Sequence, residues 1–223
     1  MFKAVIFDWD GTLADTKKAV LESFQKVLTE IGCIVNDEFL ERRIGTGTRK
    51  MLEDALNKCS ITFDKKMLEE LARKKVRHQK ELSKSVTLFE GATDLLDALY
   101  SGVKIALASM SSRPVIDKLL AEKQIKKYFD AVVTATEISK PKPDPEIFLV
   151  AATKLNLPPQ HCIVIEDSIF GVKAAKKAKM KCIAIPSGAY TKKELQKEKP
   201  DLLIDSLTQK NKILNFILQK ARS

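Results

Sequence analysis

The N-terminal stretch Lys3-Ala4-Val5-Ile6-Phe7-Asp8-Trp9-Asp10-Gly11-Thr12 carries the strongest structural signal in the chain. Its apolar half, rich in Val, Ile and Phe, predicts a short buried strand, and two carboxylates and a glycine follow it directly. Ligands of open α/β sheets bind at the carboxyl ends of the strands. We therefore expect Asp8 and Asp10 to face a binding crevice, although Asp and Gly are also ordinary turn residues.

Other short apolar runs alternate with segments of helical spacing along the second half of the chain. Such alternation predicts βαβ units and a parallel sheet. The expected strands are residues 3–7, 104–108, 131–134, 162–165, 181–185 and, as a last edge strand, 202–204. Their Val, Ile and Ala composition is typical of strands covered on both faces. The predicted fold class is therefore α/β, with a doubly wound parallel sheet.

The segment between the first strand and the others predicts helices only. Residues 49–59 and 65–84 each have apolar side chains at helical spacing, as does the segment before them. An all-helical block inserted into an α/β unit is typical of a second, smaller domain. We expect this cap domain to span residues 16–85, with an α/β catalytic core formed by residues 1–15 and 86–223.

Polar residues follow four of the expected strands, and a parallel sheet would bring them to one edge. They are Asp8 with Asp10, Ser109, the lysines of the segment 139–145, and Glu166 with Asp167. Clustered carboxylates repel one another unless a cation lies among them, and all-oxygen donors favour a hard ion such as Mg²⁺. A lysine and a hydroxyl beside that ion suit a phosphoryl group. The residues thus indicate metal-assisted phosphoryl transfer.

These segments resemble the four motifs of the haloacid dehalogenase superfamily, in particular its β-phosphoglucomutase and phosphoglycolate phosphatase-like members. The matching segments are Asp8-Trp9-Asp10-Gly11-Thr12, Ser109, Lys140 within Lys-Pro-x-Pro-Asp, and Glu166-Asp167 within Ile-Glu-Asp-Ser-x-x-Gly. They occur in order over essentially the whole chain. The resemblance implies a Rossmann-like core with an inserted helical cap, and a Mg²⁺-dependent enzyme acting on a small phosphorylated metabolite.

The resemblance also implies catalytic roles. Asp8 is expected to be the nucleophile that becomes an aspartyl-phosphate, and Asp10 the general acid and base. Ser109 and Lys140 are expected to bind the phosphate, with Lys140 also offsetting charge beside Asp8. Lys142 occupies the variable position of the motif and is assigned no role. For Ser109, a plain turn-capping role stays open.

A Mg²⁺ site and further substrate contacts follow from the same resemblance. The expected ligands are Asp8, Asp167, the backbone carbonyl of Asp10, and Glu166 as a further ligand or as the residue that orients the metal's water. An alternative for Glu166 is a hydrogen-bond acceptor behind the ligands. Gly11 permits a close approach of the backbone to a ligand, and with Thr12 it is expected to bind substrate.

Substrate choice is expected to lie in the cap, at Gly45-Thr46-Gly47-Thr48-Arg49. Arg49 is expected to bind a carboxylate or second phosphate of the substrate, the alternative being a solvated arginine in a helix connection. Asp10 argues against a dehalogenase, because that branch lacks a carboxylate there. Val20 stands where β-phosphoglucomutases carry a histidine. We therefore predict a phosphatase, with a phosphosugar mutase as the alternative.

Composition bounds the remaining function classes. The 39 basic and 29 acidic side chains leave a net charge of +10, spread along the chain rather than gathered in a tail. With only 6% aromatic residues, no nucleic-acid partner is expected, and a non-enzymatic binding protein with a basic surface is the alternative of another class. No apolar run approaches the ~20 residues that span a bilayer. We expect no membrane partner and a cytoplasmic location, and make no prediction of oligomeric state.

Overall fold

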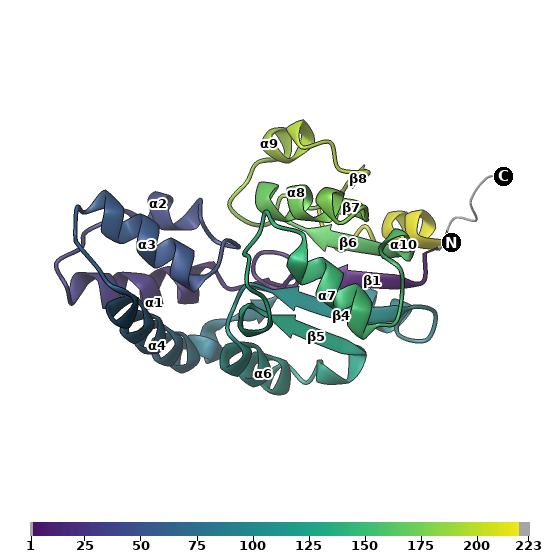
Figure 1. Cartoon of the computed structure of the whole chain (residues 1–223). Coiled ribbons are helices and arrows are strands. Elements are labelled where there is room, and N and C mark those ends of the chain that lie inside the picture. Colours follow the sequence, from purple (N-terminus) through teal and green to yellow (C-terminus); the bar gives the residue numbers. More distant parts are fainter. Residues whose placement is uncertain (1, 219–223) are drawn as a thin grey trace.

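A six-stranded parallel sheet forms the centre of the computed structural model, which describes residues 2–218 (Figure 1). The strand order is β5-β4-β1-β6-β7-β8, so the first strand lies in the middle. The strands are β1 (Ala4–Phe7), β4 (Lys104–Ser109), β5 (Ala131–Thr134), β6 (Cys162–Glu166), β7 (Lys181–Ala184) and β8 (Leu202–Leu203). All six expected strands are present, and their bounds differ from the expected ones by at most one residue at either end.

Helices cover both faces of this sheet, because successive strand residues point to opposite sides. Val5 and Phe7 of β1 pack into one apolar cluster, whereas Ala4 and Ile6 pack into another. The helices of the first cluster are α5 (Ala92–Leu99), α6 (Arg113–Glu122) and α10 (Lys210–Leu218). Those of the second are α7 (Glu146–Lys154), α8 (Ile169–Lys177) and α9 (Lys192–Lys197). The predicted doubly wound α/β core is confirmed.

Four further helices form the cap, which lies at the left of Figure 1. They are α1 (Lys17–Thr29), α2 (Asp37–Glu41), α3 (Thr48–Lys58) and α4 (Lys65–Glu81). Phe24, Leu28, Leu52 and neighbouring side chains give the cap an apolar cluster of its own. The fold class with an inserted helical cap is confirmed. The short helix α2 is not predicted from the spacing of apolar residues, because it has only five residues.

The two chain segments that join cap and core pair with each other. β2 (Ala14–Asp15) and β3 (Thr87–Leu88) form a small antiparallel sheet. The domain limits at residues 16 and 85 stay a prediction, and they fall within two residues of these strands. Short 3-10 helices complete the described structure: η1 (Leu82–Ser85), η2 (Lys126–Tyr128), η3 (Ala135–Glu137) and η4 (Pro159–His161).

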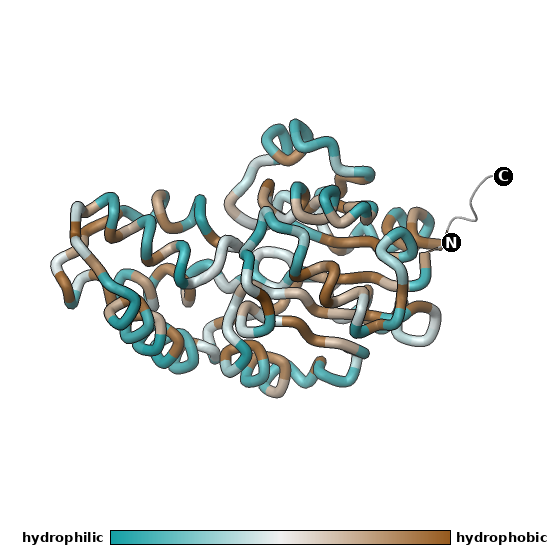
Figure 2. The backbone as a smooth tube through the Cα atoms, in the orientation of Figure 1, coloured by the Kyte–Doolittle hydropathy of each residue, from teal (hydrophilic) through white to brown (hydrophobic). Residues whose placement is uncertain are grey.

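Polar and apolar side chains separate as this architecture requires. Figure 2 shows apolar residues along the central strands and hydrophilic residues along much of α4 and α9. Among residues 2–218, no helix combines the length and the apolar character that crossing a membrane would require. Burial of apolar side chains stabilises both units, through two clusters in the core and one in the cap.

The cap cluster predicts a measurable difference between two aliphatic residues. Leu52 is fully buried, so we expect Leu52→Ala to lower the free energy of unfolding by about 2–5 kcal/mol. Ile34 is 83% exposed, so Ile34→Ala is the matched control and should change this free energy by less than about 0.5 kcal/mol. Urea denaturation measures both, and equal effects of the two substitutions would contradict the assignment of the cap core.

Candidate active site

The site forms where the central strands end. Asp8 follows β1 directly, and its backbone N–H donates to the Ile165 carbonyl at 3.0 Å, which continues the strand pairing. Ser109 and Glu166 are the last residues of β4 and β6, the two neighbours of β1. A single edge of the sheet therefore presents groups from three strands, as expected for parallel strands.

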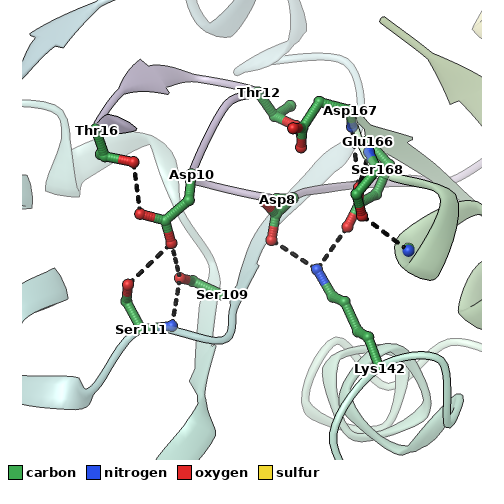
Figure 3. A network of polar contacts seen from close by, with 11 residues as sticks. Asp8, Asp10, Thr12, Thr16, Ser109, Ser111, Lys142, Glu166, Asp167 and Ser168 are labelled. Atoms are coloured by element: carbon green, nitrogen blue, oxygen red, sulfur yellow. Dashed lines mark hydrogen bonds and ion pairs between the residues drawn. The ribbon is translucent and has the colours of Figure 1, made fainter. Parts of the chain in front are cut away.

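Lys142 lies between two of the carboxylates (Figure 3). Its Nζ is 2.6 Å from Asp8 Oδ1 and 2.6 Å from Glu166 Oε1. All three side chains are buried, and the Lys142 Nζ also lies 5.0 Å from the centre of the Phe148 ring. These are buried, charge-assisted contacts, in which each partner depends on the others for compensation of its charge.

Backbone and hydroxyl donors hold the carboxylates of Glu166 and Asp167. Glu166 Oε2 accepts hydrogen bonds of 2.9 Å from the backbone N–H of Asp167, from that of Ser168 and from the Ser168 hydroxyl. Thr12 donates to Asp167 Oδ1 at 3.1 Å. Ser168 also caps α8 by accepting from Gly171 N at 3.0 Å. The residues at the start of α8 thus orient Glu166, and Thr12 orients Asp167.

The charges of this cluster favour a bound cation. Oxygen atoms of Asp8, Glu166 and Asp167 lie within 4.8 Å of one another, and all three residues are buried. Burial, together with the neighbouring carboxylates, raises the pKa of Asp8 to about 8 and that of Asp167 well above its ordinary value, although Lys142 opposes both shifts. Burial alone would lower the pKa of Lys142, but Asp8 and Glu166 raise it overall. One lysine therefore does not balance three carboxylates, and an all-oxygen donor set suits a hard divalent ion.

Asp10 lies on the other side of Asp8 and is held by three hydroxyl groups (Figure 3). Thr16 donates to Oδ1 at 2.7 Å, while Ser109 and Ser111 donate to Oδ2 at 3.2 Å and 2.9 Å. The Ser109 hydroxyl also accepts from the Ser111 backbone N–H at 3.0 Å. These contacts fix the direction of the carboxylate and join β1, β4 and the start of the cap.

Gly11 is required by the shape of this loop. Its φ is +84°, and a Cβ atom there would lie 2.3 Å from Asp167 Oδ2. A side chain would therefore collide with the acidic cluster besides straining the backbone. The Gly11 carbonyl accepts from the Ser187 hydroxyl at 2.6 Å, so the loop is also tied to the segment after β7.

The structure corrects the prediction made for the two lysines of the segment 139–145. Lys140 is exposed, and its backbone N–H donates to Glu146 at 2.7 Å. Lys142, to which no role is assigned above, is the residue in contact with Asp8. The chain contains Lys-Pro-x-Pro twice in overlapping registers, starting at Lys140 and at Lys142, and burial distinguishes them. Lys142 lies inside the turn that the hydrogen bond from the Asp144 backbone N–H to the Pro141 carbonyl closes, and its side chain is buried.

Arg49 is also not brought to the site. Its side chain is 65% exposed and lies 3.4 Å from Glu69 of α4, within the cap. The neighbouring residues of the cap loop are closer to the chemistry. Two small cavities flank Asp10, and Ile44 lines both of them. Arg49 thus fits the alternative interpretation, a largely solvated side chain in a helix connection.

Lys75 is a site residue absent from the sequence-based prediction. It is 2% exposed and lines one cavity beside Asp10 together with Val20 and Ser111. Its Nζ donates to Gln79 at 2.5 Å. Burial lowers its pKa to about 8, and the nearby Asp10 only partly offsets this. Its position in the sequence could have indicated it: Lys75 shares the buried face of α4 with Leu68 and Leu71, where an apolar residue is expected.

Comparisons with known proteins agree with this geometry. Residues 5–185 match the family profile of haloacid dehalogenase-like hydrolases. A phosphorylated carbohydrates phosphatase of Thermotoga maritima is 34% identical over 179 residues, 79% of this chain and 81% of that protein. A beta-phosphoglucomutase of Bacillus subtilis is 33% identical over 192 residues, 83% and 84% of the two chains. The crystal structure of a beta-phosphoglucomutase from Clostridium difficile superimposes with a TM-score of 0.86 at 28% identity, covering 98% of this chain and 100% of that one.

The two lysines of the segment 139–145 should differ sharply on substitution. Lys142→Met leaves Asp8 and Glu166 without their cationic partner, so we expect the free energy of unfolding to fall by about 3–5 kcal/mol. Lys140→Met is the matched control, and we expect it to change this free energy by less than about 0.5 kcal/mol. Chemical denaturation in metal-free buffer measures both. Equal stability of the two variants would refute the buried ion pairs.

The buried Lys75 predicts a pH-dependent stability. We expect Lys75→Met to raise the free energy of unfolding by about 1–3 kcal/mol near neutral pH, because the charged lysine is desolvated in the folded chain. Its folded pKa of about 8 lies below the ordinary value of 10.5, so the cost is complete below about pH 8 and disappears as the pH rises toward 10.5. Denaturation of both proteins near neutral pH and at pH of about 10 tests this. A Met advantage of the same size at both pH values would contradict it, and Lys74→Met, a half-exposed neighbour, serves as control.

Proposed function

Because this chain belongs to the haloacid dehalogenase-like hydrolases, we propose that it hydrolyses a small phosphorylated metabolite with Mg²⁺, through an aspartyl-phosphate on Asp8. The family membership makes it a phosphoric monoester hydrolase, which sets aside the non-enzymatic alternative. The observation that carries the proposal is the position of Asp8: it lies at the end of the central strand, between the Lys142 ammonium and the carboxylate of Asp10 (Figure 3).

In the proposed first half-reaction, a carboxylate oxygen of Asp8 attacks phosphorus, and the ester P–O bond breaks on the opposite side. Asp10 gives a proton to the departing oxygen, which leaves as an alcohol. Lys142 and the Ser109 hydroxyl offset charge on the transferring phosphoryl oxygens. The hydroxyls of Thr16 and Ser111 hold the Asp10 carboxylate in direction, so its proton is delivered from a fixed position.

In the proposed second half-reaction, water replaces the alcohol. Asp10 takes a proton from the water while the water oxygen attacks phosphorus, and the bond between phosphorus and the Asp8 oxygen breaks. Inorganic phosphate and the free Asp8 carboxylate result. Asp8, Asp167, Glu166 and the Asp10 carbonyl are the residues that would hold Mg²⁺, whose chemistry there is to neutralise negative charge on the carboxylates and the phosphoryl group.

Hydrolysis is favoured over a mutase reaction by the cavity beside Asp10. Its apolar wall includes Val20 and Phe24 of α1, both buried, so α1 offers no proton acceptor at those positions. The relatives include enzymes named for each activity, a carbohydrate phosphatase and a beta-phosphoglucomutase. A phosphorylated carbohydrate is therefore the first substrate class to try, with phosphoglycolate beside it.

Phosphate release from a panel of phosphorylated metabolites tests the proposal. The panel includes β-glucose 1-phosphate, phosphoglycolate and an aryl phosphate, each with Mg²⁺ and with chelator. We expect Mg²⁺-dependent release that Asp8→Asn abolishes. Ser109→Ala should weaken transition-state stabilisation by about 2–4 kcal/mol, by analogy with loss of one oxyanion donor. An Asp8→Asn enzyme with full turnover would exclude the nucleophile assignment, and isomerisation of β-glucose 1-phosphate without phosphate release would mean a mutase.

A further inference from the structure

One arginine of the cap makes a dense set of contacts with the core. Arg42 is the residue at the C-terminus of α2. Its guanidinium donates to both carboxylate oxygens of Glu194, at 2.6 Å and 3.3 Å, and to the Ala189 carbonyl at 3.0 Å. It also lies over the Tyr190 ring, 4.3 Å from the ring centre, and the Tyr190 hydroxyl donates to the Arg42 carbonyl at 2.6 Å. A planar guanidinium suits this combination of bidentate and stacked contacts, which a lysine cannot make.

The core side of this contact is held rigidly. Tyr190 is 3% exposed and packs edge-to-face against Phe170 of α8. Glu194 is already fixed at the start of α9, where its carboxylate accepts from the backbone N–H and the hydroxyl of Thr191. Arg42 therefore meets partners whose positions the core determines, so few degrees of freedom are lost when the contact forms.

The contact controls where the next residues of the cap lie. Residues 43–47 run from Arg42 to the start of α3, and Ile44 lines both cavities beside Asp10. A Cβ on Gly47 would lie 2.8 Å from the end of Met110, and one on Gly45 would lie 3.6 Å from the Ser168 hydroxyl. This loop thus approaches the residues after β4 and after β6, on either side of the reacting groups.

We propose that Arg42, Glu194 and Tyr190 form a latch between cap and core that positions the loop 44–47 against the site. They are positioning residues, since the described contacts place none of them on Asp8. The inference deepens the proposed function: a loop held in this place excludes bulk water and aligns the leaving group with Asp10. The hinge strands β2 and β3 tie the two units together through the chain itself, whereas the latch is a contact that can open and close.

The chain offers clean variants and a matched control. Glu194→Gln removes the charge but keeps an acceptor for Thr191, because Gln also completes a capping box. Tyr190→Phe removes only the hydroxyl. Arg43 is the control: it is the neighbouring arginine, but its partners Asp54 and Phe39 both belong to the cap. Arg43→Gln therefore breaks contacts of similar kind without touching the core.

Two independent measurements separate positioning from folding. Hydrogen exchange of the backbone amides of residues 44–47 should speed up in Arg42→Gln, Glu194→Gln and Tyr190→Phe, but not in Arg43→Gln. With the best substrate of the panel, kcat/KM should fall about 10- to 100-fold in Arg42→Gln and Glu194→Gln. The double variant Arg42→Gln/Glu194→Gln should be no worse than Arg42→Gln alone, since that single variant already removes the contact with Glu194 together with those to Ala189 and Tyr190. Thermal unfolding of all variants reports any loss of the fold itself.

The outcomes distinguish this inference from the proposed function. Faster exchange of the amides of residues 44–47 in the latch variants supports the latch, even if the protein turns over no phosphoester. Absence of turnover would contradict the proposed function but not the latch. Unchanged exchange and unchanged kcat/KM in Arg42→Gln, at intact stability, would overturn the latch while leaving the phosphatase in place. Additive losses in the double variant would also overturn it, because Arg42 and Glu194 would then act independently. Equal losses in Arg43→Gln would do the same, because they would assign the effect to the cap's own stability.

Discussion

The ion pairs from Lys142 to Asp8 and Glu166 are the interactions on which the site is arranged. They join the loop before α7 to the ends of β1 and β6, and all three groups are buried. In that environment a charge without a partner is costly, so the position of each group depends on the other two. With Asp167 added, the cluster keeps an excess of negative charge, which is the condition for holding a hard cation beside a phosphoryl group. The proposed Mg²⁺ would offset this excess of negative charge.

The sequence was sufficient for the fold because its patterns are strong and mutually consistent. Near-continuous apolar runs of four to six residues encode strands buried on both faces, and the alternation with helices leaves a parallel sheet as the consistent arrangement. Once the strands are parallel, the residues that follow them must converge. Asp8, Ser109 and Glu166 could be placed at one edge for this reason, without knowledge of any side-chain contact.

Residues whose importance depends on burial could not be placed in the same way. Lys140 and Lys142 occur in the same motif two residues apart, and only the three-dimensional turn decides which one enters the core. Arg42 and Arg43 pose the same problem in the cap: adjacent and identical in type, they face the core and the cap interior respectively. Lys75 is the case with a readable signal, a cation at a core position of an amphipathic helix. Specific side-chain direction, rather than element type, is the information that a single sequence lacks.

The central place of β1 in the sheet has a consequence for the order in which this protein is made. β1 leaves the ribosome well before its partners β4 and β6, which begin only at Lys104 and Cys162. The cap helices α1 to α4 all lie between β1 and β4 in the chain, so they are translated before the middle of the sheet can pair. Contacts this distant in sequence form slowly and expose strand edges meanwhile. A chain that stops before Cys162 thus carries Asp8 and a full cap and can pair β1 with β4, but it lacks the neighbour that completes the acidic edge, and the other side of β1 stays open until β6 is made.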